Sequence, residues 1–104
     1  MADITGLYQA LLGRILGDDA AAPLELRQAA LDNAGLDEPI RTLVDTVAHR
    51  SYRVSDEDVA AARSAGLSED QIFEIVVCAA VGQATRQYTG ALEALAAAGE
   101  GGPR

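Results

Sequence analysis

The sequence has few of the residues on which most redox and metal chemistry depends. Its 104 residues include no tryptophan, one phenylalanine, one histidine and one cysteine. The lone Cys78 permits neither an intramolecular disulfide nor a resolving thiol within one chain, so dithiol chemistry would need a second subunit or an external thiol. One histidine and one cysteine far apart in the sequence form no metal-ligand pattern. We therefore expect no metal and no cofactor.

Basic residues and long apolar runs are also scarce. Eight Lys and Arg residues oppose sixteen Asp and Glu, for a net charge of −8. An acidic surface repels phosphate backbones and anionic lipids, which argues against nucleic acid or a membrane as a partner. The first residues lack a basic leader, and Arg14 interrupts their apolar run. The longest nearly apolar run, residues 72–82, contains Glu74 and is too short to cross a bilayer. We expect a soluble cytoplasmic protein.

What the chain does contain is apolar residues at helical spacing. Hydrophobic residues make up 49% of the sequence, and their pattern predicts an all-α single domain over residues 1–97 with a disordered tail at 98–104. Residues 68–95 form the longest predicted helix, which a capping box of Ser68 and Gln71 begins. One of its faces carries Ile72, Ile75, Val76, Ala79, Gln83 and Arg86, and the other carries Phe73, Val77, Ala80, Ala84, Tyr88, Leu92 and Leu95.

A helix that is apolar on both faces is normally buried on both. The remaining predicted helices, at residues 4–16, 24–33, 40–50 and 56–65, are too short to cover it. We therefore predict a bundle of about five helices that is an obligate homo-oligomer. Gly82 and Gly90 each cost about 1 kcal/mol inside a helix, which indicates the close approach of another backbone. Through Ala80, Gly82 and Ala84 the long helix is expected to meet another subunit, while its other face packs on the helix that ends at His49.

Local signals set the ends of the shorter helices. Gly35 and Gly66 are expected to stop the helices before them, Gly66 in a left-handed cap. Asp37 is the expected N-cap of the third helix, with Pro39 just inside it. The fourth helix begins at Ser55, where Asp58 completes a shorter-armed relative of the capping box. Its inner side is expected to carry Val59, Ala62 and Arg63.

The run DEDVAAARSAGLSEDQIFEIVVCAAVGQATRQYTGALEAL, residues 56–95, resembles the second half of the alkylhydroperoxidase D and carboxymuconolactone decarboxylase superfamily. Members share a helical pair joined by an A-R-x-A-G-L-S turn, here residues 62–68. Residues 36–50 look like the helix that leads to that family's active site, so the likeness covers about the last two thirds of the chain. The resemblance implies a small helical fold of the alkylhydroperoxidase D type.

The redox motif of that family is missing. Its redox members carry C-x-x-C-x-x-x-H before the turn, and the matching places here are Ser51, Val54 and Asp58. A serine cannot replace a thiolate that attacks sulfur. The family's upstream glutamate falls near Glu38, or on Thr42 in an alignment with a short deletion. We therefore expect no dithiol peroxidase activity.

A few residues are candidates for other chemistry. Cys78 lies among apolar residues, where a thiol is inert core filling. Glu74, flanked by apolar side chains, must be paired, protonated or at the edge of the buried zone, and it is a candidate general acid or base. His49 has the only side chain that titrates near neutrality without perturbation, although a cation at a helix C-terminus is also favoured by the dipole.

Arg50, Tyr52 and Arg53 follow His49 directly and are the candidate ligand-binding residues. Three functions remain open. The first is a non-redox member of the family that serves as an accessory protein or binds a small organic ligand. The second is an acid–base enzyme, of decarboxylase, lyase or isomerase type, that uses His49 and Glu74 on a small carbonyl or lactone. The third is a structural oligomer that recruits a partner protein.

Overall fold

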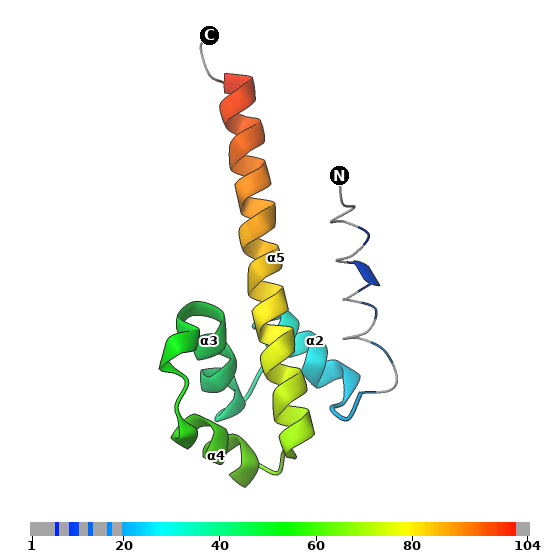
Figure 1. Ribbon diagram of the computed structural model, residues 1–104, viewed down its shortest axis with the longest axis vertical. Helices are drawn as coiled ribbons and strands as arrows, with labels where there is room; N and C mark the ends of the chain where they lie inside the picture. Colours follow the sequence, from blue (N-terminus) through cyan, green and yellow to red (C-terminus); the bar gives the residue numbers. More distant parts are fainter. Residues whose placement is uncertain (1–5, 7–8, 11–12, 14–16, 18–19, 102–104) are drawn as a thin grey trace.

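Four α-helices and one short 3₁₀ helix lie in the part of the chain that the structure describes. The structure is a computed structural model, which describes residues 6, 9–10, 13, 17 and 20–101. Its elements in chain order are α2 (Leu24–Asp32), α3 (Ile40–Arg50), the 3₁₀ helix η1 (Ser51–Arg53), α4 (Asp56–Ser64) and α5 (Glu69–Gly101). None of these described residues forms a strand, which confirms the all-α class. In Figure 1, α3 and α2 lie on the two sides of α5, and α4 lies near its lower end.

The N-termini of α4 and α5 are capped as predicted. The Ser55 hydroxyl accepts the N–H of Asp58 at 3.2 Å, and the Asp58 carboxylate accepts the N–H of Ser55 at 3.0 Å. Ser68 and Gln71 make the same reciprocal pair at 3.1 and 2.8 Å. Gly66, with a φ of 104°, has the predicted left-handed conformation after α4. These ends depend on residues three or four positions apart, which is why the sequence predicts them well.

Three local predictions need correction. Asn33, with a φ of 50°, is the left-handed C-cap of α2, two residues before Gly35. Pro39 is the N-cap residue of α3, not Asp37. The carboxylate of Glu38 instead accepts the backbone N–H of Thr42 at 3.0 Å. On α4, Arg63 is exposed and pairs with Glu69 rather than facing inward.

The core lies where α2, α3 and α4 meet the first half of α5. The residues fully or nearly removed from water are Ala30, Leu36, Ile40, Leu43, Val44, Val47, Ala62, Ile72, Ile75, Cys78 and Ala79. Burying a Leu or Ile side chain stabilises the fold by about 1.5–3 kcal/mol. Helix α5 packs on α3, the helix that ends at His49, as predicted. Leu43, Val44 and Val47 are among the residues of α3 in this core.

Gly82 brings α2 and α5 together. A Cβ added at Gly82 would overlap the carbonyl oxygen of Leu31 and lie 2.7 Å from its carbonyl carbon. The same oxygen accepts a hydrogen bond from Arg86 Nη1 at 2.8 Å. The predicted close approach of another backbone is thus confirmed at Gly82, but that backbone is α2 of the same chain. Gly82 therefore does not face another subunit. At Gly90 the prediction is wrong, because a Cβ there would meet nothing within 4 Å.

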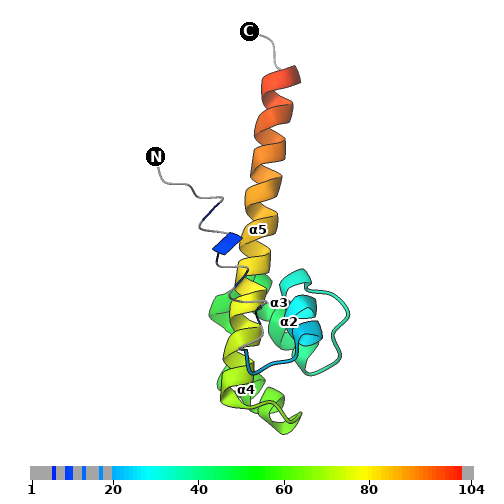
Figure 2. The ribbon, with the colours of Figure 1, turned by 90° about the vertical axis from the view of Figure 1, so that its right-hand side faces the viewer.

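The second half of α5 rises beyond the other described elements (Figures 1 and 2). The helix has 33 residues, so it is about 50 Å long, and every residue from 86 to 99 is exposed. The helix continues to Gly101, whereas a disordered tail was predicted from residue 98. Ala-rich sequence has a high helix propensity, which outweighs Gly99 here.

The predicted helix at residues 4–16 falls mostly outside the described residues. Gly6, Gln9, Ala10 and Gly13 are described and helical. The apolar residues of the predicted helix, Leu7, Leu11, Leu12, Ile15 and Leu16, lie outside the described residues. Within the described residues, no helix has the length and apolar composition needed to span a lipid bilayer.

Candidate functional site

Glu74 fastens the segment before α2 to α5. Its two carboxylate oxygens accept the backbone N–H groups of Ala21 and Ala22, each at 2.8 Å. One turn earlier on α5, Gln71 donates to the carbonyl oxygen of Ala21 at 3.2 Å. A carboxylate that accepts two backbone N–H groups is a strong anchor. The structure therefore places Glu74 as a paired residue, one of the alternatives that its apolar neighbours suggested.

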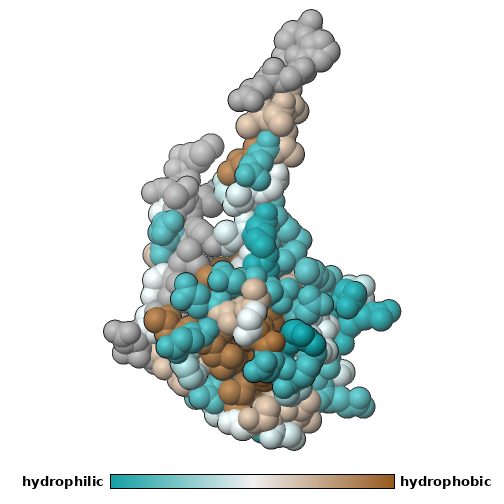
Figure 3. Space-filling model, turned by 180° about the vertical axis from the view of Figure 1, so that it is seen from behind, coloured by the Kyte–Doolittle hydropathy of each residue, from teal (hydrophilic) through white to brown (hydrophobic). Residues whose placement is uncertain are grey.

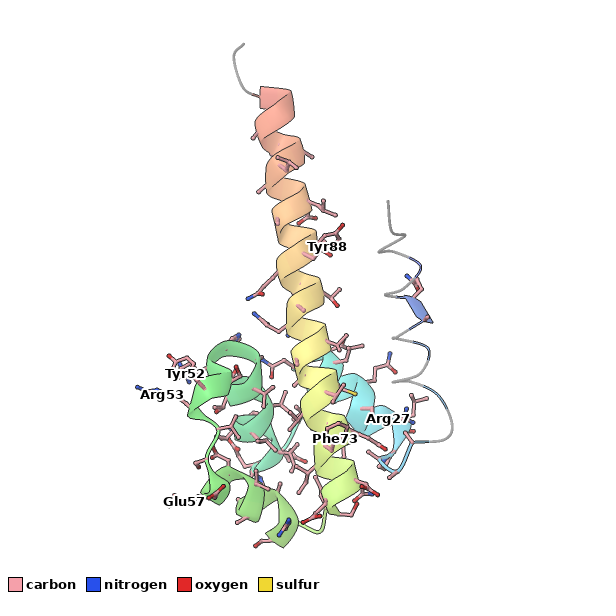
Figure 4. The ribbon with its side chains drawn as sticks, in the orientation of Figure 1. Arg27, Tyr52, Arg53, Glu57, Phe73 and Tyr88 are labelled. Carbon is pink, nitrogen blue, oxygen red and sulfur yellow. The ribbon has the colours of Figure 1, made fainter. Side chains whose placement is uncertain are left out.

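Arg27 of α2 holds the same segment from the other side, although nothing in the sequence singled it out. It is only 4% exposed. Its Nε donates to the carbonyl oxygen of Ala22 at 2.9 Å and its Nη1 to that of Gly17 at 2.8 Å. Figure 4 shows Arg27 beside the segment that leads into α2. A buried guanidinium needs several acceptors, and backbone carbonyls contributed by a loop leave no sequence signal.

His49 is engaged elsewhere, on the outer side of α3. Its Nδ1 lies 3.7 Å from Oδ1 of Asp45, one turn earlier, which makes an ion pair when the imidazole is protonated. The same Asp45 oxygen accepts a hydrogen bond from Asn33 Nδ2 at 3.2 Å. His49 and Glu74 therefore have different neighbours and share no hydrogen-bond partner. The spacing of Asp45 and His49, four residues apart on a helix, was the signal that could have identified this pair.

Of the predicted ligand-binding residues Arg50, Tyr52 and Arg53, only Arg50 lines the groove that the described residues form along α3. Tyr52 is 82% exposed, and in Figure 4 it lies with Arg53 at the outer edge of the molecule. The groove that Arg50 lines is shallow, with a volume of about 440 Å³. The other residues of this groove are Asn33, Glu38, Arg41, Thr42, Asp45 and Thr46.

Glu38 precedes α3 and is held within this groove by the first turn of that helix. The hydroxyl and the backbone N–H of Thr42 donate to its carboxylate, and Arg41 pairs with it at 3.0 Å. These hydrogen bonds, the hydroxyl's foremost, lower the pKa of Glu38 below its usual value. Glu38 and Thr42, the two alternatives for the family's upstream glutamate, are thus hydrogen-bonded to each other at the start of α3.

Cys78 is buried in the core, as its apolar neighbours predicted. Burial raises the pKa of its thiol from the ordinary 9.0 to about 11, Arg27 opposes this shift, and Glu74 adds to it. The thiol is therefore protonated at neutral pH and closed to solvent. A nucleophilic cysteine needs a thiolate that substrate can reach, and the protonated, buried thiol of Cys78 provides neither.

The second face of α5 is apolar, and apart from the half-buried Val77 its residues are exposed. We call it the α5 stripe, and it consists of Phe73, Val77, Ala80, Ala84, Tyr88, Leu92 and Leu95. Phe73 is 69% exposed and Leu95 71%, and Figure 4 shows Phe73 near the lower end of α5 and Tyr88 on its projecting half. At 100° per residue the stripe lies opposite the side that carries Ile75, Cys78 and Gly82. Isolated exposed apolar residues are ordinary, but a continuous line of them marks an interaction surface.

Comparison of the chain with protein-family models, curated proteins and solved structures finds no match. The likeness to the alkylhydroperoxidase D superfamily thus rests on the turn and helix residues alone. Among the residues that the structure describes, no three His, Cys, Asp or Glu side chains gather into a group that could hold a metal ion.

Proposed function

We propose that the chain is a non-redox helical accessory protein of the alkylhydroperoxidase D type, which associates with further copies of itself through the α5 stripe. The exposed stripe is the observation that carries this proposal. It runs for 22 residue steps from Phe73 to Leu95, or about 33 Å of helix. Leaving this much apolar surface in water is unfavourable, and covering it drives association.

The neighbours of the candidate catalytic residues favour this function over acid–base catalysis. Both oxygens of Glu74 are taken up by backbone N–H groups. A general base must present an oxygen to substrate within hydrogen-bond distance, and Glu74 would have to release the segment before α2 to do so. His49 pairs with Asp45 on an exposed helix face. The arrangement supports structural roles for both residues.

Light scattering on the full chain at micromolar concentration tests the proposal. The wild type is expected to have at least twice the mass of one chain. Ala84→Glu places a carboxylate in the middle of the stripe and should weaken association at least 10-fold. Thr89→Glu, an exposed position on the other side of α5, is the matched control and should leave the mass unchanged. A monomeric wild type would refute the proposed function.

A hydroperoxide turnover assay with added thiol tests the non-redox part separately. We expect no activity that depends on Cys78, because its thiol is buried and protonated. Wild type and Cys78→Ser should give the same background rate. Robust turnover in the wild type that is lost in Cys78→Ser would contradict this part of the proposal.

A second candidate function is the binding of a small polar ligand in the groove along α3. Arg50 lines this groove together with Thr42 and Thr46, whose hydroxyls donate to Glu38 and to the Thr42 carbonyl oxygen and can still accept a hydrogen bond. A thermal-shift screen of small polar metabolites should then give stabilisation that Arg50→Ala abolishes. Arg53→Ala, which lies outside the groove, is the control. Shifts that are equal in both variants would count against this candidate.

A further inference from the structure

The spacing of residues along the centre of the α5 stripe is symmetrical. At 100° per residue, Leu92 lies at the edge of the stripe, whereas Ala91 lies in its central line. The central positions 73, 77, 80, 84, 88, 91 and 95 are separated by 4, 3, 4, 4, 3 and 4 residues. The order of these intervals is the same in both directions, and its centre is Ala84. A second copy of α5 that runs antiparallel and crosses at Ala84 therefore brings each of these seven central positions opposite another of the seven, while Leu92 lies opposite Val76.

We infer that two copies of this chain pair antiparallel along the α5 stripe, with the two-fold axis at Ala84. This inference rests on the proposed function and specifies its partner as a second copy. A two-fold interface uses the same patch on both subunits. In this register Phe73 meets the partner's Leu95, Ala80 meets the partner's Tyr88, and Ala84 meets its own counterpart.

Side-chain sizes agree with this register. The large ring of Tyr88 lies opposite the small Ala80, and Val77 lies opposite Ala91. In close-packed interfaces, large and small residues alternate across facing positions. A parallel pair would instead set Tyr88 against Tyr88 and Ala80 against Ala80, which leaves crowded and empty layers. Two alanines at the crossing point also let the two backbones approach closely.

The exposure of α5 favours the antiparallel arrangement as well. Its first half is covered by α2 and α3 on the side opposite the stripe, while all residues from 86 to 99 are exposed. Figure 3 shows the projecting half standing clear of the hydrophilic and apolar surface of the body. An isolated helix of this length is only marginally stable in water. Antiparallel pairing places the projecting half of one copy along the body half of the other. The stripe on each half is then covered by the stripe on the other copy.

Cysteine cross-linking of the full chain tests the register. Ala84→Cys should form a disulfide-linked dimer on mild oxidation, because residues at the two-fold axis face each other. Phe73→Cys and Leu95→Cys should not cross-link alone, but an equimolar mixture of the two should give the mixed dimer. The wild type, whose Cys78 is buried, is the control and should give none.

The outcomes separate the inference from the proposed function. A dimer by light scattering in which Phe73→Cys cross-links to itself would show parallel pairing and overturn the register alone. A dimer without any of these cross-links would place the interface elsewhere and overturn the register. A monomer would overturn both.

Discussion

Replacing Gly82 by alanine is the most direct test of how α2 and α5 fit together. The added methyl group would overlap the carbonyl oxygen of Leu31 and lie 2.7 Å from the carbonyl carbon and 3.0 Å from the Cα atom of that residue. All three atoms belong to the backbone, so no side-chain rotation can relieve the overlap. Helix α2 would have to move away from α5, and the hydrogen bond from Arg86 to Leu31 would lengthen with it.

Two opposing effects set the size of the change. Overpacking a closely packed site costs about 1–3 kcal/mol, and a backbone clash belongs at the upper end of that range. Alanine regains about 1 kcal/mol of helix propensity over glycine. The steric effect is larger, so Gly82→Ala should lower the free energy of unfolding by about 2 kcal/mol, or Tm by roughly 10 °C for a domain of this size.

Gly90→Ala is the matched control. It lies on the same helix, but a Cβ there meets nothing within 4 Å, so only the propensity gain of about 1 kcal/mol remains. Urea unfolding followed by far-UV circular dichroism, at one protein concentration, measures both variants. If Gly82→Ala proved as stable as the wild type, α2 could not pack on α5 as closely as the contact between Gly82 and Leu31 requires.

Three further predictions concern stability and reactivity. Glu74→Ala should lower the free energy of unfolding in urea by about 1–2 kcal/mol, because it leaves the N–H of buried Ala22 without its charged acceptor, while water can replace the carboxylate at exposed Ala21. Exposed Glu93→Ala should change it by less than about 0.5 kcal/mol. Ser68→Ala removes the cap of α5 and should cost about 1 kcal/mol in the same experiment; no loss would show that the cap is dispensable. The Cys78 thiol should react with Ellman's reagent at pH 8 only after unfolding. Because this thiol has a pKa of about 11 when folded and an ordinary value of 9.0, stability should fall as pH rises from 9 towards 11, and Cys78→Ala should lack that component in urea titrations at each pH.

The helix pattern was predictable because it depends on short-range interactions. The capping pairs of Ser55 with Asp58 and of Ser68 with Gln71 involve residues three positions apart, and the buried face of α5 follows from a 3.6-residue period. The prediction at the start of α3 was wrong for a local reason. Helix α3 begins at Ile40, after Pro39, so Glu38 rather than Asp37 stands next to its first turn and accepts the backbone N–H of Thr42.

The candidate site was harder to predict because its contacts join distant residues. The sequence identified Glu74 as a carboxylate that needs a partner, but its partners are backbone N–H groups 53 and 52 residues away. Arg27 gave no signal, because backbone carbonyls are its acceptors. Gly82 signalled a close approach, and only the packed structure shows that Leu31 of the same chain makes it.

Sequence periodicity and capping residues were enough to define the helices and to show that α5 is apolar on two faces, since both properties arise within a few turns of one helix. Tertiary packing decided which of those faces is covered. Helices α2, α3 and α4 bury the side that carries Ile75 and Cys78, and they leave the α5 stripe in water. Which face is covered depends on how closely other backbones can approach it. Because Gly82 has no side chain, α2 can pack closely against the face of α5 that carries Gly82.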